Sequence, residues 1–296
     1  MGIFSLFKKE DALYYPGCMT YYKYKQNFEL YQRIFSKLGI NIISGENIVC
    51  CGLPALEAGY EQEAWKLSRK NYELFKEEGV KRVITNCPAC LKMFSKDYPE
   101  LLPDWDIEVI DTWSLILNRL AKKPRLIKKK GEEIIGYHDS CYLGRYCGIY
   151  DAPRQILELI GYMIEEIPDN KENSMCCGSC GGLPIVNKEL ANKITKQRLL
   201  QAKRKGIKKI VVASMKNYDL LKKNADGLDI EILELSEVLA RALGIKIKEI
   251  ESEEEESIIG EQEVIDLEED MKIKNELKEE IFEEDEQDKI LEEEDF

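Results

Sequence analysis

The sequence predicts an α/β protein built from two tandem, internally repeated domains with mostly parallel sheets, followed by an acidic C-terminal tail. Two observations carry this prediction. Short apolar runs typical of buried strands alternate with longer runs of helical periodicity, and the same order of elements occurs twice along the chain. Alternation of strands and helices favours parallel sheets, because each helical crossover returns the chain in the same direction. We expect the domains at residues 12–122 and 132–246 and the tail at 247–296.

Each repeat is expected to begin with a short strand that runs into a turn carrying a cysteine. These segments are LYYPGC at residues 13–18 and IIGYHDSC at residues 134–141. A helical pattern follows in both copies, at 24–38 and 152–160.

The centre of each repeat is a Cys-Cys-Gly sequence followed by a helix and a buried-type strand. In the first copy we expect Cys-Cys-Gly at 50–52, a helix at 61–78, a glycine that ends it with a strand at 79–85, and a last strand with its helix at 106–120. In the second copy the corresponding ranges are 176–178, 188–205, 206–212 and 229–243. Cys18, Cys87 and Cys141 fall just past predicted strands, where α/β proteins usually bind their ligands.

The joint between the repeats is a charged segment with proline and glycine, AKKPRLIKKKG at 121–131. The net charge of −13 conceals two regions of opposite sign. Residues 251–296 contain 23 Asp or Glu and 4 Lys, whereas residues 1–250 contain 39 Lys or Arg and 33 Asp or Glu. We expect the tail to be solvated, disordered or a frayed helix. Its apolar residues, at partly helical spacing, leave open a helix that docks on the basic body or on a partner.

Several classes of protein are disfavoured by composition. No run of about 18 apolar residues is present, so we expect no membrane span. The N-terminus lacks the basic start of a secretory signal and has Leu6 where myristoylation needs Ser or Thr, so we expect a cytoplasmic protein. No basic cluster with groove-reading or aromatic motifs suggests nucleic-acid binding. In a reducing compartment, ten cysteines favour metal or redox chemistry over structural disulfides.

Five cysteines of the first repeat form the pattern C-x31-CC-x35-CxxC, at positions Cys18, Cys50, Cys51, Cys87 and Cys90. Thiolates are the ligands of zinc and of iron–sulfur clusters. Adjacent cysteines suit a single tetrahedral zinc ion poorly, because neighbouring side chains diverge, whereas a cluster of several irons accommodates them. A disulfide between neighbours would be strained. Gly52 removes a side chain where the backbone comes close to a cofactor.

This pattern resembles the cysteine-rich CCG domain found in the B-type and D-type subunits of heterodisulfide reductase, in the iron–sulfur subunits of glycerol-3-phosphate dehydrogenase and glycolate oxidase, and in lactate-utilisation proteins. The segment YHDSCYLGRYCGIYDAPR at 137–154 resembles the D-type branch, and the resemblance covers residues 12–246. It implies that a complete motif holds a noncubane [4Fe–4S] cluster, and that the five cysteines above are the ligands of the first cluster. In the B-type subunits such clusters cleave a disulfide between two thiol coenzymes.

The second repeat departs from the family pattern. Ser214 and Asn217 occupy the positions of the CxxC thiols, while Cys147 and Cys180 are additional. The count of cysteines in this half is therefore again five: Cys141, Cys147, Cys176, Cys177 and Cys180. Three interpretations stay open. The extra thiols replace the lost pair and hold a rewired cluster, the site has lost its cluster and keeps a thiol pocket or substrate site, or it binds zinc.

His138, Cys141 and Arg145 are the candidate catalytic residues beside the second site. His138 is the only histidine and could donate a proton or a hydrogen bond, although a loop histidine with structural partners is an equally simple interpretation. Arg145 could bind a carboxylate or phosphonate through both of its terminal nitrogens, or form a surface ion pair.

We therefore expect an iron–sulfur oxidoreductase subunit of the heterodisulfide-reductase type, which transfers electrons to a disulfide, a thiol compound or an organic acid. The alternative is a non-catalytic electron-transfer or docking subunit of a larger redox complex. The chain has no ferredoxin run of C-x2-C-x2-C-x3-C-P, so the expected electron donor is a separate ferredoxin-like iron–sulfur subunit or a flavoprotein. A structural zinc protein is disfavoured by the adjacent cysteines.

Overall fold

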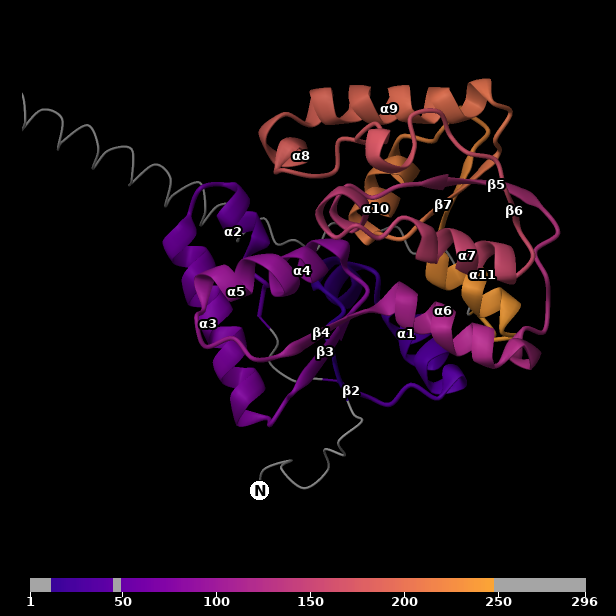
Figure 1. Ribbon diagram of the computed structural model, residues 1–296. Coiled ribbons are helices and arrows are strands. Elements are labelled where there is room, and N and C mark those ends of the chain that lie inside the picture. The colour runs from indigo at the N-terminus through magenta and orange to yellow at the C-terminus, as the bar shows by residue number, and fades with distance from the viewer. Residues whose placement is uncertain (1–11, 45–48, 248–296) are drawn as a thin grey trace, which may run out of the picture. The chain divides into compact units, whose positions relative to one another are not determined.

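Two four-stranded sheets, one in each half of the chain, form the centre of the structure (Figure 1). The computed structural model describes residues 12–44 and 49–247, so the predicted tail lies outside the described residues. The strand orders are β2-β1-β3-β4 and β6-β5-β7-β8, and every pairing is parallel. The predicted α/β class with parallel sheets is confirmed.

The first half follows the predicted order and adds several short elements. It contains β1 (Ala12–Tyr14), η1 (Met19–Lys23), α1 (Lys25–Leu38), β2 (Ile42–Ser44), α2 (Leu53–Glu57), α3 (Glu61–Glu77), β3 (Arg82–Thr85), α4 (Pro88–Lys92), η2 (Met93–Asp97), α5 (Tyr98–Leu101), β4 (Glu108–Asp111), α6 (Thr112–Lys122) and η3 (Pro124–Leu126). The side chain of Asp111 accepts hydrogen bonds from the backbone N–H groups of Trp113 and Ser114, which explains why α6 begins directly after β4.

The second half repeats this order. It contains β5 (Ile134–His138), η4 (Tyr142–Tyr146), α7 (Asp151–Leu159), β6 (Met163–Ile164), η5 (Lys171–Asn173), α8 (Leu183–Val186), α9 (Lys188–Arg204), β7 (Lys209–Val212), α10 (Met215–Lys223), β8 (Glu231–Glu234) and α11 (Leu235–Ala242). The strands β2 and β6 were not predicted, because two or three residues are too few to show a period. The π-helical turns η1 and η4, each directly after a cysteine, also leave no sequence period.

The register of the strands brings the cysteine loops together. Tyr14 of β1 lies beside Ile84 of β3, and His138 of β5 lies beside Val212 of β7. Each pair is close to the carboxyl end of its strands, so the chain segments that follow the paired strands leave the sheet at the same edge. The motif residues of each half follow those strand ends.

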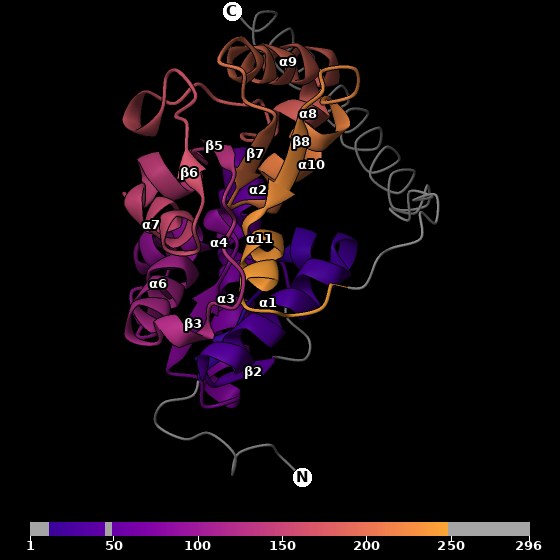
Figure 2. The ribbon, with the colours of Figure 1, turned by 90° about the vertical axis from the view of Figure 1, so that its right-hand side faces the viewer.

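One hydrophobic cluster spans the two halves. Helix α1 packs against α11 and α6 packs against α7 (Figure 2), and buried side chains from both halves, such as Trp113 and Leu239, belong to one apolar cluster. Polar contacts reinforce this interface, since Tyr31 donates to Glu234 at 2.8 Å. The described residues up to Ile247 accordingly belong to one compact unit.

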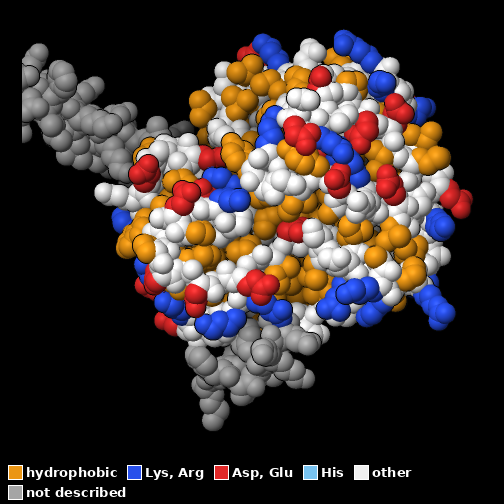
Figure 3. Space-filling model, viewed as in Figure 1, with side chains coloured by type: hydrophobic (Ala, Val, Ile, Leu, Met, Phe, Trp, Pro, Cys, Tyr) orange, Lys and Arg blue, Asp and Glu red, His pale blue; other side chains and the backbone are white. Residues whose placement is uncertain are grey.

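Charged side chains of both signs are interspersed with apolar ones on the face shown in Figure 3. Neither sign gathers into a single extended patch over the described residues of that face. None of the helices in the described ranges has the length and apolar character needed to cross a membrane.

Candidate functional site

Three chain segments carry the five cysteines of the first half to one edge of its sheet. Cys18 follows β1 and precedes η1. Cys50 and Cys51 end the loop after β2, and Cys87 and Cys90 open α4 directly after β3. The backbone N–H of Cys87 donates to Thr85 at 3.1 Å, which holds the turn between the strand and the helix.

Gly17 shows how closely two of these segments approach each other. A side-chain β-carbon at Gly17 would lie 2.7 Å from Cys87 Cβ, 3.1 Å from Cys87 Sγ and 3.3 Å from Cys90 Sγ. Gly17 also has a φ of +78°, in the region that favours glycine. The loop that carries Cys18 can therefore rest on the CxxC turn only because residue 17 has no side chain.

Hydrogen bonds from three side chains to backbone carbonyls hold the Cys-Cys-Gly loop in place. Tyr15 donates to Val49 O at 2.5 Å, Asn71 to Cys50 O at 2.9 Å and Tyr98 to Cys51 O at 3.1 Å. Three consecutive carbonyls are thus bound by three side chains, of which Tyr15 and Tyr98 are buried and aromatic. This arrangement leaves the thiols as the groups of the loop that are free to bind a cofactor.

The thiols of the first half influence one another strongly. Hydrogen bonds from Cys50 and Cys90 hold the pKa of Cys51 well below its ordinary value. A hydrogen bond from Cys90 likewise lowers the pKa of Cys87. A thiolate among several thiols is the form that binds a soft metal centre.

A lysine from the second half reaches this set of thiols. Lys216 lies in the first turn of α10 and is half-buried. Burial alone would lower its pKa, but the nearby thiols, chiefly Cys87 and Cys18 and then Cys180, raise it above its ordinary value. Lys216 therefore adds a positive charge near thiols of both halves.

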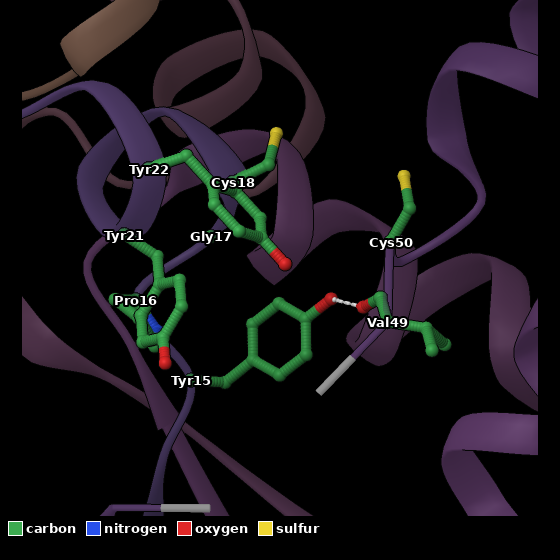
Figure 4. Close-up of a pocket in the computed structure, with 8 residues that line it drawn as sticks. All are labelled: Tyr15, Pro16, Gly17, Cys18, Tyr21, Tyr22, Val49 and Cys50. Carbon is green, nitrogen blue, oxygen red and sulfur yellow. Dashed lines mark hydrogen bonds between the residues drawn. The ribbon is translucent and has the colours of Figure 1, made fainter. Parts of the chain in front are cut away.

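A small cavity of about 70 Å³ opens beside two of the first-half thiols (Figure 4). Cys18 and Cys50 line it together with an apolar and aromatic wall: Tyr15, Pro16, Gly17, Tyr21, Tyr22 and Val49. The rings of Tyr21 and Tyr22 meet edge to face at 5.0 Å and are exposed. The cavity therefore joins solvent to the thiols past an aromatic surface.

Within the described residues, no group of three or more His, Cys, Asp or Glu side chains has the arrangement that holds a single metal ion. A cluster of several irons needs thiolates that surround a larger body than one ion, supplied from diverging directions. The first half offers five thiols from three loops, a glycine that admits close approach and a half-buried positive charge near the thiols. The chemistry of this donor set fits an iron–sulfur cluster.

The second half brings three of its five cysteines together. Cys141 and Cys180 have their sulfurs 3.0 Å apart. Both also hydrogen-bond to Cys176, whose pKa they lower well below its ordinary value. The backbone N–H of Gly178 donates to Cys176 Sγ at 3.3 Å. We call Cys141, Cys176 and Cys180 the thiol triad.

The other two cysteines of this half have different surroundings. Cys177 is buried, and Asn217 donates to its sulfur at 3.1 Å and to Ser179 at 2.7 Å. Cys147 lies apart from the triad, among Ser95, Lys96 and Asp111 of the first half, and burial raises its pKa to about 11. The structure therefore does not bring Cys147 to the other four thiols.

His138 lies beneath the second site and is held as a neutral ring. Its Nδ1 accepts a hydrogen bond from Arg198 Nε at 3.2 Å, and burial together with the positive charge of Arg198 lowers its pKa to about 3. The ring can donate a hydrogen bond through Nε2, whereas an imidazolium is not available at neutral pH. Arg145 is exposed and donates to Ser174 O at 3.0 Å, in the segment that precedes Cys176.

A buried ion network beside His138 was not anticipated from the sequence. Arg154 binds Asp139 through two hydrogen bonds of 2.7 and 2.8 Å, and Glu166 through two of 2.6 and 2.9 Å. Lys216 and Arg198 were also missed. Both lie on helices that contain several other Lys and Arg residues, so nothing in the local sequence distinguishes them. A comparison of the two repeats position by position is the signal that could have identified them.

The family model of the CCG cysteine-rich domain matches the chain twice, over residues 12–95 and 135–216. The D-type subunit of the dihydromethanophenazine:CoB–CoM heterodisulfide reductase of Methanosarcina barkeri is 30% identical over 245 residues, which are 80% of this chain and 60% of that protein. The EtfAB:quinone oxidoreductase of Syntrophomonas wolfei is 32% identical over 186 residues, which are 62% of this chain and 26% of that protein. A probable iron–sulfur-binding oxidoreductase of Bacillus subtilis is 32% identical over 200 residues, which are 66% of this chain and 28% of that protein.

The chain thus spans about 60% of the length of the heterodisulfide reductase relatives it matches. Among solved structures, a hypothetical protein from Helicobacter pylori superposes with a TM-score of 0.62 at 13% identity, over 81% of this chain and 50% of that one. At that identity the likeness concerns the fold.

Proposed function

The chain belongs to the CCG family of cysteine-rich domain proteins, and we propose that it is an iron–sulfur oxidoreductase subunit of the heterodisulfide-reductase type. The observation that carries this proposal is the placement of five thiols from three loops at one edge of the sheet, where Gly17 lets the Cys18 loop rest against Cys87 and Cys90. Relatives named as a heterodisulfide reductase and as an EtfAB:quinone oxidoreductase support a redox role. The proposed substrate class is a small disulfide, with a thiol compound or an organic acid as the wider range.

The residues proposed to hold one [4Fe–4S] cluster are those of the complete motif: Cys18, Cys50, Cys51, Cys87 and Cys90. When bound, such a cluster supplies one-electron transfer at a site where thiol sulfur can approach iron. The chain itself orients the ligands through the carbonyl contacts of Tyr15, Asn71 and Tyr98. Bound carbonyls restrict the motion of the loop, which favours one geometry in both oxidation states.

The same residues also shape the approach of a substrate. Tyr21 and Tyr22 form an apolar wall beside Cys18, suited to the carbon chain of a thiol compound. Lys216 places a positive charge where a thiolate product would carry negative charge.

Electrons are proposed to come from a ferredoxin-like iron–sulfur subunit or a flavoprotein, in the cytoplasm. A second candidate is a non-catalytic electron-transfer or docking subunit, which the loss of both CxxC thiols in the second half favours. The two differ in one assay. A catalytic chain, reconstituted with iron and sulfide and given a chemical electron donor, reduces a small disulfide alone, whereas a docking subunit takes up electrons without reducing it.

The proposal is tested by counting iron and acid-labile sulfide in anaerobically purified protein, with electron paramagnetic resonance on the same sample. We expect about four irons per chain and a signal that disappears in Cys87→Ser. Cys147→Ser is the matched control, because that thiol lies apart from both sets of thiols. Protein that stays free of iron after reconstitution would refute the proposed cluster.

A further inference from the structure

The second half contains the scaffold of a cluster site without its full set of ligands. Ser214 and Asn217 replace the two thiols of the turn after β7. Asn217 instead donates to Cys177, so a polar amide fills the place where a fourth ligand would be. Cys147 also lies apart, so three thiols remain together. Three thiols are too few to supply the set of five ligands proposed for the cluster of the first half.

We propose that the thiol triad of Cys141, Cys176 and Cys180 is a thiol–disulfide exchange centre that reacts directly with small disulfides and holds no second cluster. Two geometric facts support this. The sulfurs of Cys141 and Cys180 are already in contact at 3.0 Å. All three triad cysteines are partly exposed, whereas Cys177 is buried.

The exchange proceeds in two balanced steps. Cys176, whose sulfur accepts a hydrogen bond from the N–H of Gly178, loses its proton and attacks one sulfur of the disulfide R–S–S–R′. A Cys176–S–S–R bond forms, the S–S bond of the substrate breaks, and R′S⁻ leaves and takes up the proton that Cys176 lost. A neighbouring triad thiol then loses its proton and attacks Cys176 Sγ, so that RS⁻ leaves and takes up that proton. The sum is R–S–S–R′ plus two protein thiols giving RSH, R′SH and one disulfide within the triad.

The surroundings of the triad suit a polar disulfide. Lys216 lies near Cys180 and also near three thiols of the first half, so the triad adjoins the proposed cluster site. Cys141 and Cys180 pack against the apolar cluster of the first half. Within the described structure, Ser140 Oγ, Arg198 Nη2 and Asn217 Oδ1 are buried without hydrogen-bond partners on residues that adjoin this site.

Exchange itself does not depend on the proposed function, but repeated turnover does. Return of the triad disulfide to thiols takes up two electrons and two protons, and the reductant is an iron–sulfur electron donor of the kind proposed above. A single turnover without any electron donor therefore examines the exchange centre alone.

The test uses anaerobically purified full-length protein, one equivalent of glutathione disulfide and no electron donor. We expect release of two glutathiones per chain and one disulfide within the triad, located by peptide mass spectrometry. Cys176→Ser should lower the release rate at least tenfold. The double variant Cys141→Ser/Cys180→Ser should stop at a mixed disulfide and release one glutathione.

Cys177→Ser and Cys147→Ser are the matched controls and should each release two glutathiones at the wild-type rate. Folded wild type that releases none, or controls that slow as much as Cys176→Ser, would overturn the exchange centre. So would eight irons per chain, half of them lost in Cys176→Ser, since the triad would then hold a cluster. A chain that exchanges normally but binds no iron would refute the proposed function and leave the exchange centre intact.

Discussion

The two halves place the same loops on the same scaffold and surround them with different side chains. In each half, the glycine of the Cys-Cys-Gly sequence lies close to the fourth residue of a long helix, Gly52 to Ala64 of α3 and Gly178 to Ala191 of α9. A hydroxyl four residues after that alanine donates to its carbonyl in both halves. Ser68 donates to Ala64 O in α3, and Thr195 donates to Ala191 O in α9. The backbone arrangement of a CCG domain therefore does not require the full set of thiols.

The differences lie in the residues that face the loop. At the eleventh position of the helix, Asn71 binds the carbonyl of Cys50, whereas Arg198 in the second half binds His138. Three residues before the first cysteine, Tyr15 in one half corresponds to His138 in the other. The first half thus supports its Cys-Cys-Gly loop with neutral groups, while the second places a cation and a neutral imidazole beneath it. Fold and chemistry are therefore set by separate positions of the repeat.

Restoring the missing thiols of the second half should have the largest effect on cluster binding. Ser214→Cys with Asn217→Cys rebuilds a CxxC turn after β7 and frees Cys177 from its amide partner. If ligand identity alone separates the halves, reconstituted protein should bind about eight irons per chain where the unaltered chain binds about four. Iron and sulfide analysis measures this. An unchanged iron count would mean that Arg198 and His138 also exclude a cluster.

The shared glycines give the next largest expected effect. In Gly178→Ala, the new methyl group would lie 2.8 Å from Ala191 O at a φ of +87°. The left-handed backbone costs about 1–2 kcal/mol and the overpacking about 1–3 kcal/mol, so we expect a loss of about 3 kcal/mol in unfolding free energy by urea denaturation.

Alanine variants of two other glycines provide a comparison for the loss of unfolding free energy in Gly178→Ala. Gly52→Ala should cost less, because its contact with Ala64 O would be 3.2 Å. Gly181→Ala, which has a φ of +64° and open space around it, should show the backbone cost alone. Equal losses in all three variants would contradict the close approach of Gly178 to α9.

The unfolding free energy is expected to depend on pH through a carboxyl group at the interface of the two halves. Asp111 and Glu234 are each the last residue of the final strand of their repeat, and each binds the first turn of the next helix. Burial raises the pKa of Glu234 to about 7, and its hydrogen bonds from Ser236 and Tyr31 only partly offset this. The stability contributed by the protonated carboxyl is complete below about pH 4.5 and is lost as the pH rises through 7.

Glu234→Gln removes this titration and keeps the acceptor for Tyr31. From pH 5 to pH 8, the unfolding free energy of the variant should rise relative to wild type by about 2–3 kcal/mol. Comparison of the two proteins at each pH cancels the opposite contribution of His138, whose depressed pKa lowers stability as the pH falls below 6.5. A difference that stays constant with pH would contradict the raised pKa of Glu234.

Much of this comparison was accessible from the sequence, and its limits are physical. The repeat, the parallel sheets and the long helices follow from periodicity, because α1, α3, α7 and α9 each extend over at least two turns. Strand-end cysteines were expected at one edge by the geometry of parallel sheets. The separation of Cys147 from the triad, and the pairing of Asn217 with Cys177, depend on side-chain directions within short turns. No sequence period encodes those directions.

The smallest expected effect concerns Arg145, which the sequence suggested as a ligand for an anionic substrate. Its guanidinium donates to Ser174 O, two residues before Cys176, and is exposed. A single exposed hydrogen bond contributes about 0.5–1.5 kcal/mol, so Arg145→Ala should lower the unfolding free energy by about that amount or less. The rate of glutathione release should stay within twofold of wild type if the side chain only steadies the loop. A much larger drop in rate for glutathione disulfide, with no such drop for the uncharged disulfide of mercaptoethanol, would instead assign Arg145 to substrate binding, because only the first substrate carries carboxylates.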